Sequence, residues 1–132
     1  MKSLLVKIKD KYQIDLNERD NEIELLTVGK DKKFTVSYSH GEYTVYSDKW
    51  HEHFEDLEEL EKFIDGLLAG NIQIAIKYRG QTPVGHQVQI IKDRKKHVIS
   101  QTGSLFSAFW KKNSIEYINY STANKTINPT GR

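Results

Sequence analysis

Most of this chain consists of short segments in which apolar and polar residues alternate, and this pattern constrains the fold more than any other feature. Alternation with a period of two is typical of β-strands that bury one face. The strand candidates are 22–28, 33–39, 42–47, 71–79, 86–93, 96–101, 105–110 and 114–120. Gly41, between the second and third candidates, can adopt the left-handed conformation that a tight hairpin requires. The first three candidates therefore predict an antiparallel meander.

Two connections in the second half of the chain carry turn signals. The segment 80–85 contains two glycines and Pro83, which predicts a turn after the strand at 71–79. The residues 93–95 are polar and charged, and they predict a hairpin between the next two strands.

Only one segment, 57–69, has clear helical periodicity. Its apolar residues recur at one-turn spacing and predict a buried stripe; they are Leu57, Leu60, Phe63, Ile64, Leu67 and Leu68. Asp56 is placed to cap the first turn, with Glu59 three residues later as in a capping box. Gly70 is placed to end the helix.

The segment 3–12 has two interpretations. Leu4, Leu5, Ile8 and Tyr12 lie at one-turn spacing and favour a short N-terminal helix, whereas the alternation of Leu4, Val6 and Ile8 favours a strand. Strands interrupted by one strong helix predict an α+β fold, with an antiparallel sheet of about six to eight strands and helix 57–69 packed on it. We expect a single domain over 1–121 and a polar, frayed tail over 122–132.

Composition excludes several classes of site. The chain has no cysteine, so it has no disulfide and no cysteine-ligated metal. The first apolar run breaks at Lys7, too early for a signal peptide, and no window is apolar enough to span a membrane. We therefore expect a cytoplasmic protein without a membrane partner. Phosphate-binding loops and dinucleotide fingerprints are absent, and Gly103-Ser104 lacks the second glycine of a nucleophile elbow. We expect no cofactor and favour a non-enzymatic role.

Charge is distributed unevenly along the chain. Residues 1–70 hold 10 Lys and Arg against 16 Asp and Glu, while residues 71–132 hold 10 against 2. Either the two halves pack together and partly neutralise each other, or two faces of opposite sign remain and one binds a charged partner.

Three short elements occur together in the order W-H-x-H-F, Y-R-G and F-W-basic-basic. They are Trp50 to Phe54, Tyr78 to Gly80 and Phe109 to Lys112. This order, over about residues 33–121, resembles a set of small uncharacterised bacterial proteins. The resemblance implies a bacterial origin, and it implies no catalytic residue or ligand.

The first functional hypothesis is a non-enzymatic protein-binding module, for example an immunity-type or regulatory binder. An acidic helix beside two aromatic anchors would dock a basic protein, because charge speeds association and aromatic residues supply affinity. The residues of this predicted interface are Tyr46, Trp50, Glu55, Glu58, Glu61 and Asp65. The alternative interpretation of the same residues is a solvated helix face.

The second hypothesis is a small nucleic-acid-binding protein that uses the basic C-terminal half. Basic groups beside exposed aromatic rings would neutralise phosphates and stack on bases. The candidate residues are Arg94, Lys95, Lys96, Trp110, Lys111 and Lys112. The alternative is an ordinary basic surface with core aromatics.

The third hypothesis is a metal-dependent enzyme that uses His51 and His53. Residues i and i+2 of an extended segment point to the same side, so the two imidazoles could converge on one ion. A third ligand would come from His40, Glu52, Glu55 or Asp56, none of which lies at a diagnostic spacing. We therefore expect no tightly bound metal.

Overall fold

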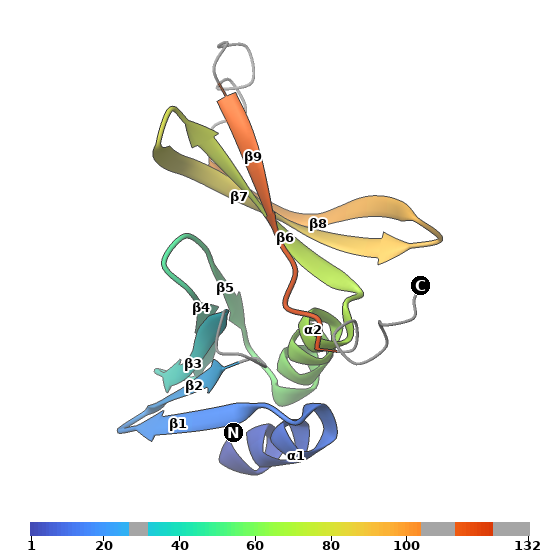
Figure 1. The fold of residues 1–132 in the computed structure, drawn as a ribbon. Helices are drawn as coiled ribbons and strands as arrows, with labels where there is room; N and C mark the ends of the chain where they lie inside the picture. Colours follow the sequence, from blue (N-terminus) through green and yellow to red (C-terminus); the bar gives the residue numbers. More distant parts are fainter. Residues whose placement is uncertain (27–31, 104–112, 123–132) are drawn as a thin grey trace.

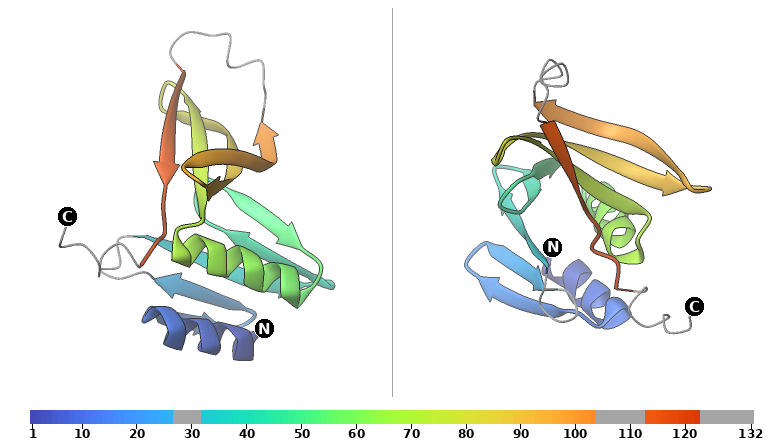
Figure 2. Two further views of the ribbon diagram at one scale, coloured as in Figure 1. Left: turned by 90° about the vertical axis from the view of Figure 1, so that its right-hand side faces the viewer. Right: turned by 45° about the horizontal axis from the view of Figure 1, so that its top comes forward.

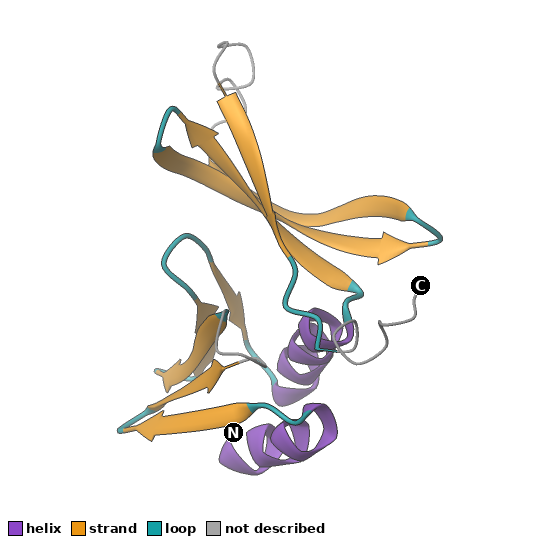
Figure 3. Cartoon of the chain, viewed as in Figure 1, coloured by secondary structure: helices purple, strands orange, loops and turns teal. Residues whose placement is uncertain are grey.

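The computed structural model describes residues 1–26, 32–103 and 113–122 as two helices and nine strands (Figures 1 and 3). The helices are α1 (Lys2–Tyr12) and α2 (Leu57–Ala69). The strands are β1 (Asp15–Arg19), β2 (Glu22–Leu26), β3 (Lys33–Ser39), β4 (Glu42–Tyr46), β5 (His51–Phe54), β6 (Ile72–Arg79), β7 (Thr82–Lys92), β8 (Lys95–Gly103) and β9 (Asn113–Ile118). They form two antiparallel sheets, so the predicted α+β class is confirmed, with the strands divided between two sheets instead of one.

The first sheet is a meander in the order β1-β2-β3-β4-β5. Its three central strands are those predicted, and Gly41 has the expected positive φ of 79° in the β3–β4 hairpin. The edge strands β1 and β5 were not predicted. In β1 only Leu16 is shielded from solvent, so the segment has no buried face to produce an alternating pattern.

The second sheet has the order β8-β7-β6-β9. The turn predicted within 80–85 is present but shorter than expected: Arg79 pairs with Thr82, so Gly80 and Gln81 form the turn and Pro83 lies within β7. Among the described residues, pairing of β7 with β8 begins at Gly85, so the start of β7 is paired there with β6 alone. Proline is tolerated at a position that pairs on one side, because its missing N–H is not needed by a second neighbour.

Helix α2 lies at the junction of the two sheets, next to β5 and β6, with α1 alongside it (Figure 2). The Asp56 carboxylate accepts a hydrogen bond from the Glu59 amide at 2.8 Å, and Gly70 ends the helix at a positive φ of 90°, as predicted. Its apolar stripe is buried except for Leu57, which is exposed. Of the two interpretations of the segment 3–12, the helix is correct: the segment lies in α1, which buries Leu5 and Ile8.

One hydrophobic cluster receives side chains from both helices and both sheets. Residue Thr122 belongs to this packed region, because it is buried and its amide donates to the Leu68 carbonyl at 3.0 Å. Thr122, which the prediction placed in the frayed tail, is therefore packed, and 123–132 lie outside the described residues. The strand candidate 105–110 also lies outside them, as do Trp110, Lys111 and Lys112. In the described part of the chain, no helix is both long and apolar enough to cross a membrane.

Candidate functional site

Two acidic residues of the predicted interface are already bound within the protein. Lys7 of α1 forms an ion pair with Glu61 at 2.9 Å, and Lys11 forms one with Asp65 at 3.0 Å. The Tyr12 hydroxyl donates to the Asp65 carboxylate at 2.6 Å. The sequence suggested that this side of α2 faces a partner, whereas the structure shows α1 lying against it.

The contacts of Asp65 make stability dependent on pH. Burial opposes ionisation of Asp65, but the hydrogen bonds from Tyr12 and Lys11 outweigh it and hold the pKa of Asp65 below its usual value of 3.8. A pKa that is lower in the folded state than in the unfolded state stabilises the fold above the unfolded-state pKa. This contribution is lost as the pH falls through the folded-state pKa.

We therefore expect the free energy of unfolding to fall between about pH 5 and pH 2 by about 1 kcal/mol more in the native protein than in Asp65→Asn. The figure is small because the Asp65 side chain is 40% exposed and solvent screens its ion pair. Urea denaturation at several pH values measures the difference. Asp10→Asn, at an exposed position of α1, should keep the native dependence. An Asp65→Asn variant with the native dependence would contradict the assignment.

The two aromatic residues of the predicted interface have different surroundings. Trp50 is only 2% exposed, packs against Phe34, Phe63 and Tyr120, and donates its indole N–H to the Tyr120 hydroxyl at 3.1 Å. It is a core residue, so it cannot serve as an exposed anchor. Tyr46 is half-buried on β4 and donates its hydroxyl to Glu22 at 2.8 Å.

The first turn of α2 and the residues before it remain acidic and exposed. Glu55, Asp56, Glu58 and Glu59 are all exposed there. Behind them lies a groove of about 590 Å³ between α2, the end of β5 and strands β6 to β8, which we call the α2–β8 groove. Its apolar lining consists of Phe54, Phe63, Ile72, Ile90 and Ile99, and its polar lining includes His53, Glu59, Lys62, Asp65 and Asn71.

Ile99 is the most exposed apolar residue of the groove. It lies on β8, an edge strand of the second sheet, and is 53% exposed. An apolar side chain at a sheet edge, next to a groove, is a common feature of surfaces that bind other chains. The prediction of the interface missed this residue because α2 and β8 are about thirty residues apart in the sequence and meet only in the fold.

The two histidines of the metal hypothesis lie side by side, as the i, i+2 rule predicts. The ring centres of His51 and His53 are 5.3 Å apart. The Nδ1 atom of His53 is within 3.0 Å of the Thr44 hydroxyl and 3.3 Å of Glu42. Among the described residues, no group of three His, Asp or Glu is arranged to hold a metal ion.

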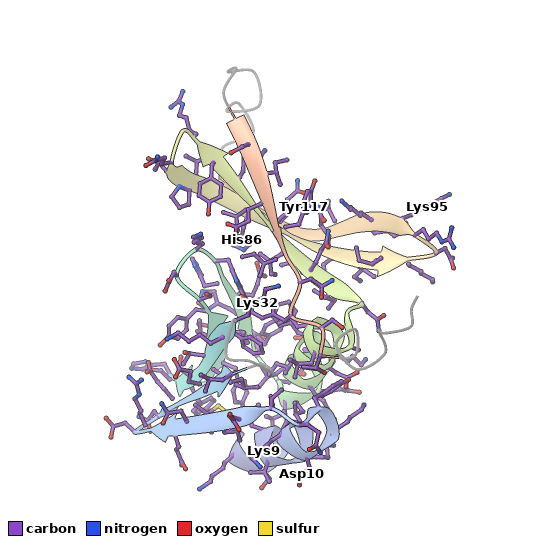
Figure 4. The ribbon with its side chains drawn as sticks, viewed as in Figure 1. Lys9, Asp10, Lys32, His86, Lys95 and Tyr117 are labelled. Carbon is purple, nitrogen blue, oxygen red and sulfur yellow. The ribbon has the colours of Figure 1, made fainter. Side chains whose placement is uncertain are left out.

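A third histidine, His86 on β7, lies close to this pair and was not predicted. It is 4% exposed, its ring centre is 6.1 Å from that of His51, and its Nε2 is hydrogen-bonded to Glu52 at 2.8 Å. The contact joins the two sheets, because Glu52 belongs to β5 and His86 to β7. Figure 4 labels His86. Of the proposed third ligands, Glu52 therefore binds His86 in the interior, and Asp56 caps α2. His40 lies in the β3–β4 turn, where its Nδ1 is 2.7 Å from the Ser39 hydroxyl.

Three basic residues of the nucleic-acid hypothesis lie in the described part of the chain, and all three are exposed. Arg94, Lys95 and Lys96 lie at the tip of the β7–β8 hairpin, where Lys92 pairs with Lys95 across a two-residue turn. Asp93 and Arg94 have φ values of 53° and 66°, which suit a turn with two left-handed residues. Among the described residues, Tyr117 places an aromatic ring near this tip, and its ring centre lies 3.9 Å from the Lys96 ammonium.

Comparisons with protein-family models, with curated proteins and with solved structures gave no match. The assignment of a function therefore depends on the geometry of the protein itself.

Proposed function

We propose that this protein is a non-enzymatic protein-binding module that holds a partner protein in the α2–β8 groove. The observation that carries the proposal is an open, mainly apolar groove whose charged lining residues are Glu59, Asp65 and Lys62. A groove of this kind accepts apolar side chains of a partner, and the burial of those side chains supplies the affinity.

The chemistry of the rim indicates the chemistry of the partner. Glu59 lines the groove, and Glu55, Asp56 and Glu58 lie within four residues of it in the sequence, whereas Lys62 is the one lysine or arginine among the described lining residues. The first seventy residues as a whole carry an excess of six acidic groups. A basic partner would be steered towards this region and would associate faster than a neutral one. A regulatory or immunity-type binder would use such a surface against a basic protein.

The proposed interface keeps only part of the set expected from sequence. Glu55 and Glu58 remain in it because they are exposed at the start of α2. Glu61, Asp65 and Trp50 contribute mainly to stability, through α1 and the core. Ile99 and Phe54 replace Trp50 as the apolar contacts.

Site-specific photo-crosslinking in the native host tests this proposal. A photoreactive amino acid at Ile99 or at Lys62, both exposed and facing the groove, should cross-link to one protein. The same group at Lys9 on α1 or Asn17 on β1, both exposed and outside the groove lining, should not. Cross-linking should weaken when Glu55 and Glu58 are both changed to Lys, and the loss should shrink as salt is added. Equal yields at groove and control positions, or cross-links to nucleic acid at the groove, would contradict the proposal.

A further inference from the structure

We propose that the face of the second sheet turned away from α2 is a separate binding site for single-stranded nucleic acid. We call it the outer face. It carries the side chains that alternate with the buried Ile72, Ile74 and Ile76 of β6. With the strand register, this assigns to it Gln73, Ala75, Lys77, Gln87, Gln89, Lys96, Val98, Ile115 and Tyr117.

Lys96 and Tyr117 lie across the outer face from each other. They belong to β8 and β9, the two edge strands, which are three strand spacings or about 14 Å apart. The ammonium of Lys96 is nevertheless 3.9 Å from the centre of the Tyr117 ring, so the two side chains lean together above the central strands. Tyr117 is still 48% exposed. An exposed ring beside a cation presents a stacking surface next to a phosphate-binding group.

Amide side chains line the middle of the outer face. The Gln73 side-chain amide donates to Gln89 at 2.8 Å, and the Gln89 amide donates to Gln87 at 2.9 Å. Gln87 is only half-buried and ends this row. Gln73 and Gln89 are buried and bonded within this row, so Gln87 is the member of the three that reaches the surface. Its amide can both donate to and accept from the edge of a base.

The charge of the outer face is of one sign. Alternation along β6 to β9 assigns to it Lys77, Arg79 and Lys96, and no Asp or Glu within the ranges 72–103 and 113–118. Glu116, the one acidic residue of β9, points to the opposite face and binds the Tyr78 hydroxyl at 2.6 Å and Lys49 at 3.2 Å. Beyond the strands, Arg94 lies next to Asp93 in the hairpin turn, and Lys95 pairs with Lys92 on the opposite face. An outer face of this charge is complementary to a phosphate backbone.

Exposed apolar groups flank the aromatic ring. Ile115 is 51% exposed beside Tyr117 on β9, and Val98 is 50% exposed on β8. A double helix would present only phosphates and groove edges to this face. Unpaired bases would cover both the ring and these apolar groups, because every base has a stacking surface. The combination of the ring, the exposed apolar groups and the lysines therefore favours a single strand.

Fluorescence anisotropy with a labelled oligothymidylate of about 12 nucleotides and the matching oligouridylate tests this inference. We expect binding by the complete protein, with an affinity that falls as salt rises. Tyr117→Ala should weaken binding by about fivefold or more, while Tyr117→Phe should keep most of it. Lys96→Gln should lower the slope of log K against log salt by about 0.7. Lys9→Gln, at the far end of the molecule in Figure 4, is the matched control and should bind as the native protein does.

A competition experiment distinguishes nucleic acid from an acidic polypeptide as the ligand of the outer face. Polyglutamate should displace the oligonucleotide poorly; if it competes as well as unlabelled oligonucleotide does, the outer face binds acidic polypeptide and the inference is wrong. If Tyr117→Ala binds as the native protein does, the interaction is non-specific charge attraction and the inference is wrong. The absence of any binding at about 50 mM salt would also overturn it. Circular dichroism confirms that each variant is folded. Changing Glu55 and Glu58 to Lys should not weaken oligonucleotide binding, so this site and the α2–β8 groove can fail independently.

Discussion

Replacing Phe63 with alanine should lower the free energy of unfolding by about 3–5 kcal/mol, which is a large part of the stability of a domain of this size. Phe63 is 5% exposed in the middle of α2, with ring centres 4.9 Å from Phe54 and 6.1 Å from Trp50. Removal of the ring leaves a cavity at the junction of helix and sheets, and rigid aromatic neighbours cannot close it. Urea or guanidinium denaturation measures the loss.

Phe63→Leu is the control for this prediction. It keeps most of the apolar volume, so it should cost clearly less than the alanine variant. Leu57→Ala is a second control on the same helix. Leu57 is exposed, so its replacement should lower the free energy of unfolding by less than about 1 kcal/mol. If Phe63→Ala also costs less than about 1 kcal/mol, α2 does not pack on the sheets as described.

Replacing Trp50 with alanine should have a comparable effect, about 3–5 kcal/mol, and should not act mainly on binding. The indole packs against Phe34 of the first sheet, Phe63 of α2 and Tyr120, which follows the last strand of the second sheet. A cavity at this position removes the packing contacts that hold the first sheet, α2 and the segment after β9 together. Thermal or chemical unfolding of the purified protein checks the prediction without any knowledge of the partner.

Trp50→Phe separates packing from hydrogen bonding. It keeps an aromatic ring but removes the indole N–H that donates to Tyr120, so it should cost about 1–3 kcal/mol, less than Trp50→Ala. A stable Trp50→Ala protein that has lost binding would restore Trp50 as a surface anchor and contradict its burial in the core.

Local signals were sufficient for much of the fold. The bounds of α2 agree with the prediction because its cap, its apolar stripe and its terminal glycine all lie within fifteen residues. The meander from β2 to β4 is equally local, since each strand alternates clearly and short turns join them. β1 was not predicted because nearly all of its residues are exposed, so its sequence has no alternation of apolar and polar residues.

The candidate surfaces were predicted less well, because surface and interior are decided by long-range packing. Glu61 and Asp65 have the composition of a free acidic face, yet α1 pairs with them from more than fifty residues away. Lys7 and Lys11 can be recognised as the partners of these two acidic residues only when α1 and α2 are known to lie together. For the same reason, nothing near Glu52 in the sequence indicates that its partner is His86 on the other sheet.

The sequence by itself determined helix α2, the strands with clear alternation, the α+β class, and the opposite charges of the two halves, since these depend on periodicity and composition. Only the tertiary structure decided that the strands divide into two sheets, that Trp50 is core, and that Ile99 lies beside the groove at α2. The physical reason is that burial depends on which elements pack together. An acidic or aromatic residue has the same local pattern whether it meets solvent, a partner or its own chain.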